Sequence, residues 1–173
     1  RQMCIRDRMY TVSKNHFGNP SSTHSSGRKS RAIIEEARCQ IASAINASPS
    51  EIIFTGGGSE ANNMVLWTLT QTEKKHVITS AIEHPAVLKV LNHLEPLGIT
   101  YSIIPVNNHG RVNADNLKNA IRSDTGLISI MMANNEVGSI QPIISLIEIA
   151  KSAGIPFHSD TVQAPLSYTQ LTL

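Results

Sequence analysis

Several residue types and patterns are scarce in this sequence, and each scarcity argues against a class of protein. Aromatic residues make up only 4% of the 173 residues, and the formal net charge is +2 with no block of like charges. Proteins that bind nucleic acids usually carry a basic stripe or stacking aromatic side chains. We therefore expect no direct binding to nucleic acid.

Long apolar runs are also missing from the sequence. The best candidates, PIISLIEIA and LISIMMA, are interrupted by Ser or Glu, and both fall short of the roughly 20 residues that cross a bilayer. The opening RQMCIRDR is polar and charged and does not have the pattern of a secretory signal. These features predict no membrane association.

Cysteine is rare as well. Cys4 and Cys39 form neither a CxxC pair nor a metal-type spacing. Proteins of reducing compartments rarely depend on disulfides, so we predict a cytoplasmic location. The remaining composition, with 40% hydrophobic and 16% charged residues, is typical of a soluble globular protein and argues against disorder.

What the sequence does contain is a regular alternation of strand and helix patterns. The first helix carries apolar residues at the spacing of one buried face, namely Ile33, Ile34, Ala37, Ile41 and Ile45. The expected strands are 51–54, 76–80, 100–106, 126–133 and 156–160, and the expected helices are 25–47, 61–71, 83–98, 112–123 and 142–154. Single helices between strands produce a parallel sheet. The prediction is an α/β fold with three αβα layers and a mostly parallel sheet.

The two ends do not continue this alternation. Residues 1–8 show no helical or strand periodicity, and PLSYTQLTL at 165–173 stands where another helix or strand is expected. We interpret both segments as non-native tails from read-through of adapter or assembly DNA. The domain proper is then 9–164, a partial large domain.

Polar residues follow several of the expected strands. In an open parallel sheet, ligands bind at the carboxyl ends of the strands. GGGSE, AIEH and NNEVG each come directly after a strand, and Asp160 and Gln163 come at the end of the last one. The sequence therefore predicts a shared site at this edge of the sheet.

The three consecutive glycines, Gly56, Gly57 and Gly58, precede Ser59 at the start of a helix. Glycine permits positive φ angles and close backbone approach, and free N–H groups at a helix N-terminus bind anions such as phosphate. The stretch is neither a Walker loop nor GxGxxG. Taken alone, a plain turn and a phosphate cradle are equally good interpretations.

The other polar residues also have two interpretations each. Asp160 can cap a helix, or it can pair with a protonated ring nitrogen or a metal, and His158 lies on the same face of its strand. His84 can cap a helix, or it can stack on a planar cofactor and move protons. Asn134 and Asn135 can form a turn or supply amide donors. Together the functional interpretations describe a pyridoxal 5′-phosphate site.

Five stretches in this order and spacing resemble the cysteine desulfurases of the NifS and IscS type. These enzymes are class V members of the pyridoxal-phosphate-dependent transferases of fold type I. The matching stretches are GNPSSTHSSG (18–27), EIIFTGGGSEANN (51–63), HVITSAIEHPAVL (76–88), SIMMANNEVGSIQPI (129–143) and FHSDTVQA (157–164). The resemblance implies that 9–164 is a piece of the large cofactor-binding domain.

The resemblance also implies roles for individual residues. Gly58 and Ser59 match the pair that binds the cofactor phosphate through backbone and hydroxyl. His84 matches the histidine that stacks on the pyridine ring and is proposed to carry protons.

Three further positions match residues around the ring. Asn135 matches the amide near the ring 3-oxygen and the substrate carboxylate. Asp160 matches the carboxylate bonded to the pyridine nitrogen, and Gln163 matches the donor to the 3-oxygen. No metal ligand is implied.

The implied activity converts L-cysteine to L-alanine and transfers sulfur as an enzyme persulfide. An iron–sulfur scaffold or a tRNA-thiolation enzyme is the implied sulfur acceptor, and a homodimer is the implied full-length state. The matching lysine and persulfide cysteine do not occur in this sequence, so the chain alone is expected to be inactive. The alternatives are a selenocysteine lyase, a small-amino-acid aminotransferase, a metal-dependent hydrolase using His84, His158 and Asp160, and a non-enzymatic fragment.

Overall fold

The computed structural model describes residues 2–164, with side chains described from Cys4 onward. The chain divides into two compact units, one ending at Phe54 and the other beginning at Thr55. Each unit is described by itself below. The predicted tail at 165–173 lies outside the described residues.

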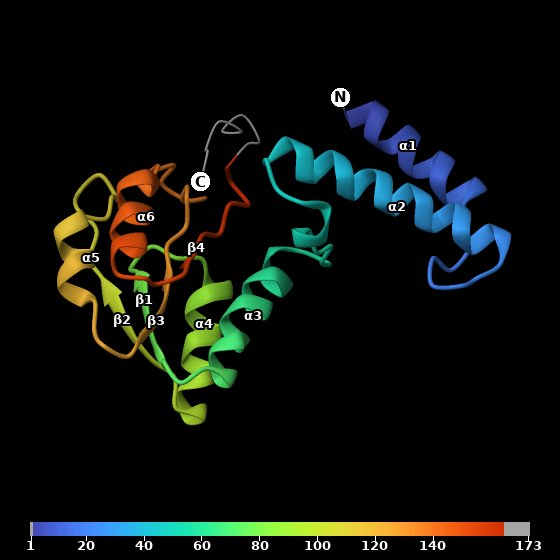
Figure 1. The fold of residues 1–173 in the computed structure, drawn as a ribbon. Coiled ribbons are helices and arrows are strands. Elements are labelled where there is room, and N and C mark those ends of the chain that lie inside the picture. Colours follow the sequence, from blue (N-terminus) through green and yellow to red (C-terminus); the bar gives the residue numbers. More distant parts are fainter. Residues whose placement is uncertain (1, 165–173) are drawn as a thin grey trace. The chain divides into compact units, whose positions relative to one another are not determined.

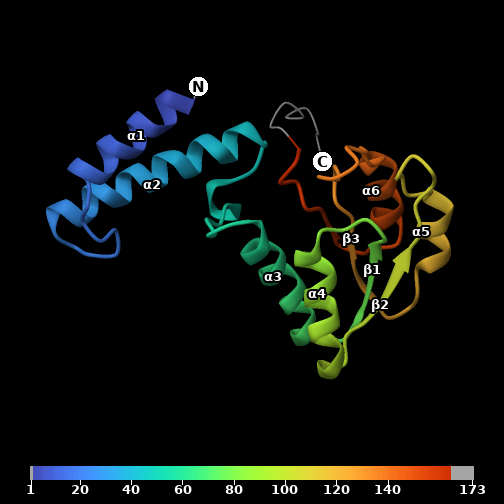
Figure 2. The same ribbon diagram turned by 180° about the vertical axis from the view of Figure 1, so that it is seen from behind.

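The first unit is helical. It contains α1 (Gln2–Asn15), α2 (Ser25–Ala44) and the short 3₁₀ helix η1 (Pro49–Glu51), and α1 runs beside α2 in both ribbon views (Figures 1 and 2). The imidazole Nδ1 of His24 accepts a hydrogen bond from the Gly27 N–H at 3.1 Å and so caps the start of α2.

Three expectations for this unit are wrong. Residues 1–8 were expected to lack helical structure, yet α1 begins at Gln2. Straight-chain residues such as Gln, Met and Arg favour a helix even where no apolar stripe exists, and the described side chains of 4–11 are all exposed. The interpretation of 1–8 as a non-native tail remains a prediction.

The expected buried face of α2 is also only partly covered. Ile41 and Ile45 are 39% and 46% exposed, and the apolar residues at 33, 34 and 37 are half-buried. An amphipathic stripe is buried only where another element packs against it. Within the described part of this unit, the partners of α2 are few.

The expected strand at 51–54 does not form either. Glu51 ends η1, and Ile52 has extended dihedral angles of −95° and 124° without any strand pairing among the described residues. A strand needs a neighbour for its N–H and C=O groups. Here the guanidinium of Arg38 donates to the Ile52 carbonyl oxygen instead.

The second unit is an α/β domain, as predicted. Its elements in chain order are α3 (Gly58–Thr68), η2 (Leu69–Gln71), β1 (His76–Ser80), α4 (Pro85–Leu94), η3 (Glu95–Leu97), β2 (Thr100–Ile104), α5 (Ala114–Ala120), β3 (Thr125–Ser129), α6 (Ile143–Ser152) and β4 (Phe157–His158). The four strands are all parallel and lie in the order β2-β1-β3-β4. Asn113 caps α5 as expected, because its side chain accepts from the Asp115 N–H at 2.7 Å.

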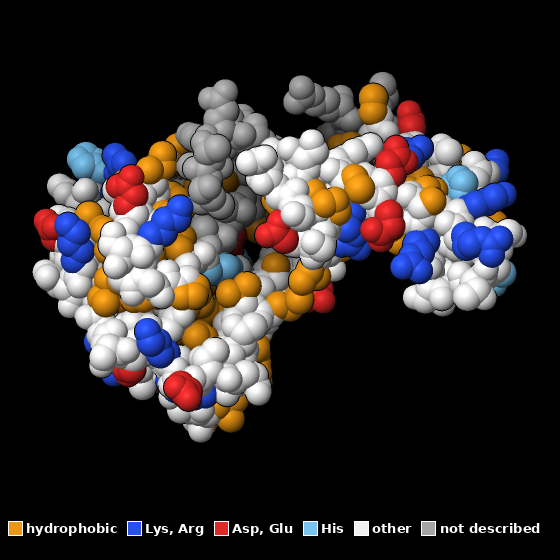
Figure 3. Space-filling model, viewed as in Figure 1, with side chains coloured by type: hydrophobic (Ala, Val, Ile, Leu, Met, Phe, Trp, Pro, Cys, Tyr) orange, Lys and Arg blue, Asp and Glu red, His pale blue; other side chains and the backbone are white. Residues whose placement is uncertain are grey.

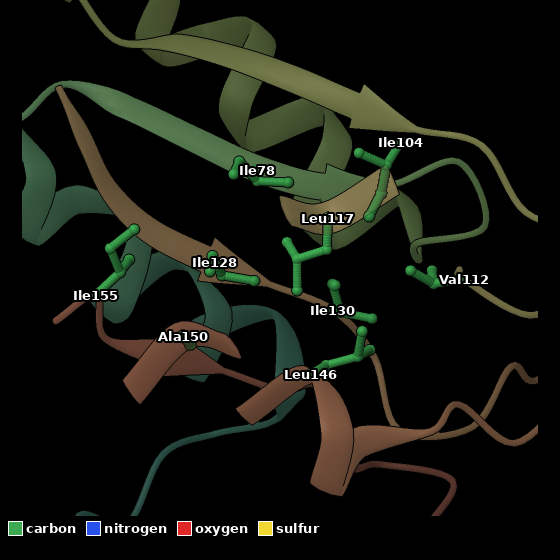
Figure 4. Close-up of a cluster of buried hydrophobic side chains, with 9 residues drawn as sticks. All are labelled: Ile78, Ile104, Val112, Leu117, Ile128, Ile130, Leu146, Ala150 and Ile155. Atoms are coloured by element: carbon green, nitrogen blue, oxygen red, sulfur yellow. The ribbon is translucent and has the colours of Figure 1, made fainter. Parts of the chain in front are cut away.

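The sheet is covered on both faces, which confirms the three-layer prediction. Adjacent strand residues point to opposite faces, so Val77 packs in a cluster with residues of α3 and α4, whereas Ile78 packs in a cluster with residues of α5 and α6. Figure 4 shows the second of these clusters, and Figure 1 shows the helices on the two sides of the sheet. Its buried members are Ile78, Ile104, Val112, Leu117, Ile128, Ile130, Leu146, Ala150 and Ile155.

Chain pairing continues beyond the ends of β3 and β4. The Ile130 N–H donates to the His158 carbonyl oxygen at 3.1 Å, and the Met132 N–H donates to the Asp160 carbonyl oxygen at 3.0 Å. These bonds hold the segment after β4 next to the segment after β3. They bring two of the predicted site loops together.

Hydrophobic side chains also remain on the surface of both units (Figure 3). The largest exposed ones include Phe17, Ile53, Phe54 and Ile144. Within residues 2–164, none of the helices combines the length and the apolar character that crossing a membrane requires.

Candidate functional site

One cavity in the second unit brings the predicted site residues together. It has a volume of about 190 Å³ and is lined by Gly58, Ser59, His84, Ala86, Met131, Asn135, Asp160, Val162 and Gln163. All six residues predicted from the sequence are in this set. They reach it from the start of α3 and from the carboxyl ends of β1, β3 and β4, which is where parallel strands place ligand sites.

The glycine-rich turn forms the start of α3. Gly57 is the N-cap and has no side chain to occupy the first-turn N–H groups of the helix, which therefore stay free for an anion. A Cβ atom on Gly58 would lie 2.7 Å from Val162 Cγ2. A larger residue at position 58 would therefore have to displace Val162 or the turn.

None of the three glycines of this turn has a left-handed φ angle. The glycines with left-handed φ lie elsewhere, at positions such as Gly98 and Gly154. Gly57 has a φ of 162°, which is extended backbone. Of the two properties that glycine permits, the turn therefore uses close approach, at Gly58, and not a left-handed φ angle.

His84 caps a helix, which is one of the two roles that the sequence left open, and it also lines the cavity. Its Nδ1 atom accepts a hydrogen bond from the Ala86 N–H at 3.1 Å and caps α4, with Pro85 at the first helical position. The ring also lines the cavity. Because Nδ1 is an acceptor here, the proton of the neutral imidazole resides on Nε2.

Asn134 and Asn135 have different roles, one in the turn and the other in the cavity lining. Asn134 is buried, its amide donates to the Ile82 carbonyl oxygen at 2.9 Å, and its Oδ1 accepts from the Glu136 and Val137 N–H groups at 2.8 Å each. Asn135 is exposed and lines the cavity. Asn134 therefore builds the turn, and Asn135 is the amide available to a ligand.

Asp160 lies half-buried at the end of the last strand. Its Oδ2 accepts from the Asn62 amide at 2.8 Å, and its Oδ1 accepts from the Val162 N–H at 3.0 Å. None of the ion pairs among residues 2–164 involves it. The carboxylate thus faces the cavity with hydrogen-bond donors but without a basic side chain.

Sequence reasoning missed Glu83, the residue before His84. Glu83 is 6% exposed, and its Oε1 accepts from the Ser80 hydroxyl at 2.6 Å and from the Met131 N–H at 2.8 Å. Its Oε2 is buried without a partner. Burial raises the pKa of Glu83 to about 7. The hydrogen bonds from Ser80 and Met131 lower this pKa and partly offset the effect of burial, whereas the charge of Asp160 raises the pKa further. A carboxylate directly before His84 was the available signal.

His158 does not join the cavity. Its Nδ1 lies 2.9 Å from the Ser129 hydroxyl, and burial lowers its pKa, although the charge of Asp160 acts in the opposite direction. In the described part of the chain, no three His, Cys, Asp or Glu residues are grouped as metal ligands.

Comparison with known protein families shows which family this chain belongs to. The model of the family described as aminotransferase class-V matches residues 2–169. The chain belongs to this family. It is 51% identical over 162 residues to a cysteine desulfurase IscS from Dictyoglomus turgidum. The aligned region covers 92% of this chain but only 41% of that protein.

Two solved structures have the same fold. A NifS-like protein has a TM-score of 0.88 at 37% identity. The matched region covers 91% of this chain and 45% of the NifS-like protein. SspA in complex with cysteine has a TM-score of 0.84 at 37% identity. The matched region covers 90% of this chain and 46% of the SspA chain. The chain therefore spans less than half the length of these relatives. The expected family and α/β fold are confirmed.

Proposed function

We propose that this chain is part of a pyridoxal 5′-phosphate-dependent cysteine desulfurase. The full-length enzyme, meaning a protein in which this segment continues as its relatives do, converts L-cysteine to L-alanine and carries the released sulfur as a persulfide. The observation that carries the proposal is the convergence of Gly58, Ser59, His84, Asn135, Asp160 and Gln163 on one cavity.

The residues present fit this cofactor in three respects. Free N–H groups and the Ser59 hydroxyl at the start of α3 suit a phosphate. The Asp160 carboxylate has no basic side chain as partner in the described residues, which suits a cationic ring nitrogen. Ala86, Met131 and Val162 supply an apolar lining for the ring.

When bound, the cofactor supplies a protonated pyridine ring that withdraws electrons from the substrate carbon. Asp160 holds the proton on the ring nitrogen by accepting a hydrogen bond from it. His84 presents its ring and its Nε2 proton to the cavity, because its Nδ1 is held by the start of α4. Asn135 and Gln163 supply amide donors to the same cavity.

The relatives support the proposed substrate, and the partners are part of the proposal. The names of the relatives and the SspA complex with cysteine support L-cysteine as substrate. The sulfur acceptor is an iron–sulfur scaffold or a tRNA-thiolation enzyme. Exposed apolar side chains in both units support a homodimer, and the two free, exposed cysteines, Cys4 and Cys39, support a reducing cytoplasm.

The decisive experiment measures cofactor binding and sulfide release by the full-length enzyme. Asp160→Asn keeps the shape of the side chain but removes its charge, so we expect L-cysteine turnover to fall roughly a hundredfold. Asp115→Asn, an equivalent change at an exposed position of α5, is the matched control and should retain wild-type turnover. Near-normal turnover of Asp160→Asn, or wild-type protein that does not bind pyridoxal 5′-phosphate, would sink the proposal.

A further inference from the structure

Asn62 is a buried polar residue that none of the roles above uses. It lies in the first turns of α3, is 3% exposed, and its Nδ2 donates to Asp160 Oδ2 at 2.8 Å. The two residues are 98 positions apart in the sequence. The bond therefore connects the helix of the glycine-rich turn to the segment after β4.

The direction of this bond is fixed by chemistry. An ionised carboxylate only accepts hydrogen bonds, so the amide nitrogen of Asn62 must face Asp160. Hydrogen bonds to charged groups are shorter and stronger than neutral ones. Asn62 is the only side chain of residues 2–164 that donates to this carboxylate, since the other donor is the backbone N–H of Val162.

The position of Asn62 on α3 gives the bond a consequence for the ligand site. Gly58 and Ser59 begin the same helix and line the cavity. Asn62 follows Ser59 by three residues, which places it about one turn further along. The first turns of α3 thus carry the residues proposed to bind the phosphate, and they also donate a hydrogen bond to the carboxylate at the opposite end of the site.

We propose that Asn62 is a positioning residue that fixes the orientation of the Asp160 carboxylate toward the ring nitrogen of the bound cofactor. This inference rests on the proposed function. Held by Asn62 at Oδ2 and by Val162 at Oδ1, the carboxylate cannot rotate freely, and its remaining lone pairs are directed into the cavity. The Asn62 bond thus ties the ring partner directly to the helix that carries the phosphate cradle.

Asn62→Asp is the sharpest test, because it exchanges a donor for a like charge with almost no change in size. Two carboxylates this close share one proton at lower pH, and the protonated group donates to the other. The other titratable groups near Asp160 are Glu83 and His158, whose pKa values respond to its charge, and His84 in the same cavity. All three are present in both wild type and variant, so the difference between the two proteins isolates position 62.

The probe is pyridoxine 5′-phosphate, which carries the ring nitrogen and the phosphate but lacks the aldehyde, so it binds without a covalent bond. Its affinity for the full-length enzyme, from which the cofactor has been removed, is measured by fluorescence titration between about pH 6 and pH 8.5. For Asn62→Asp we expect a loss of roughly a hundredfold at the alkaline end and roughly tenfold at the acidic end. Asn62→Leu, similar in size but without a donor, should lose roughly tenfold at every pH.

Asn63→Asp is the matched control. Asn63 is the next residue on α3, and its amide donates to the Ser59 carbonyl oxygen of the same helix at 2.7 Å instead of to Asp160. The same change of chemistry there should leave the pH dependence of binding as in the wild type. If Asn62→Asp does not fold, as judged by circular dichroism, Asn62→Leu and the smaller polar Asn62→Ser provide the test.

The outcomes separate this inference from the proposed function. Weakened binding in the Asn62 variants, with the acid recovery confined to Asn62→Asp, supports the inference. If Asp160→Asn weakens binding but the Asn62 variants bind like the wild type at every pH, the inference is overturned and the proposed function stands. If the wild type does not bind the probe, both are overturned.

Discussion

The carboxyl oxygen Oε1 of Glu83 accepts a hydrogen bond from the backbone N–H of Met131 at 2.8 Å. This bond joins the loop between β1 and α4 to the segment after β3. A second bond, from the Asn134 amide to the Ile82 carbonyl oxygen at 2.9 Å, joins the same two loops. Those loops present His84 and Asn135 to the cavity, so this pair of bonds holds the site together.

The raised pKa of Glu83 predicts that the protein loses stability as the pH rises. The pKa is about 4.5 in the unfolded chain and about 7 in the fold, so between these values the folded state binds more protons. Stability is then lost from about pH 4.5 to about pH 7, by up to about 3 kcal/mol in total. Glu83→Gln resembles the protonated acid and should be free of this loss.

The measurement is the free energy of unfolding in urea for wild type and Glu83→Gln across this range. Other titrating groups contribute equally to both proteins, so the difference between the two curves isolates Glu83. Glu148→Gln, at an exposed position of α6, is the control. Parallel curves for wild type and Glu83→Gln would contradict the prediction.

Gly58→Ala should weaken the binding of phosphate-containing ligands. The added Cβ would lie 2.7 Å from Val162 Cγ2, so either the turn or Val162 must shift in the cavity wall. We expect an affinity loss of roughly tenfold, on the scale of one overpacked contact. Gly57→Ala is the matched control, because nothing lies within 4 Å of a Cβ there and its backbone is extended.

A double variant identifies the cause of the Gly58→Ala defect. Adding Val162→Ala removes the atom that the new methyl group meets, and it should restore most of the affinity measured by titration. A double variant as weak as Gly58→Ala would show that the clash with Val162 is not the reason.

His76 predicts a loss of stability at acidic pH. It is fully buried, with Nδ1 2.8 Å from the Thr125 hydroxyl and Nε2 2.9 Å from the Ser102 hydroxyl. Burial, and after it the charge of Arg122, lowers its pKa below 6.5, while Asp124 acts in the opposite direction. Below pH 6.5 the unfolded chain therefore binds the proton that the fold excludes, and stability falls as the pH falls.

The check compares thermal unfolding of wild type and His76→Gln from about pH 7 down to about pH 5. The wild type should lose more stability over this range than the variant does. His109→Gln, at an exposed position, should follow the wild type. A variant curve as steep as the wild-type curve would exclude His76 as the titrating group.

Neighbouring asparagines should respond differently to the same substitution. Asn134→Asp keeps the acceptor for Glu136 and Val137 but loses the donor to the Ile82 carbonyl oxygen, so we expect a loss of about 1–3 kcal/mol in the free energy of unfolding. Asn135→Asp should change stability by less than about 0.5 kcal/mol, since that residue is exposed. Equal losses in urea unfolding would contradict this division of roles.

The sequence was sufficient for the elements that make their own local pattern. HVITS is the strand at His76–Ser80 as predicted. The helix expected at 142–154 forms as α6 over Ile143–Ser152, and Gly154 lies past its end in a left-handed conformation. The four parallel strands follow from strands separated by single helices. The same rule placed all six predicted site residues at one edge of the sheet, where they line one cavity.

Local pattern failed where a partner decides the outcome. The run at 51–54 has strand composition, but a strand requires hydrogen-bonding neighbours, and the described residues provide none there. The apolar stripe of α2 predicted burial, but burial depends on what packs against the stripe. In both cases the sequence identified the residues that could form a contact, but it did not show whether another element lies against them.

The amino-acid order by itself determined the strand–helix alternation, the parallel sheet and the set of polar residues at its edge, because these depend on side-chain periodicity and chain direction. Only the tertiary structure decided that Asn62 donates to Asp160 and that Glu83 is buried against Met131. Such contacts join residues that are 98 and 48 positions apart. Their existence depends on how layers pack, which no local pattern records.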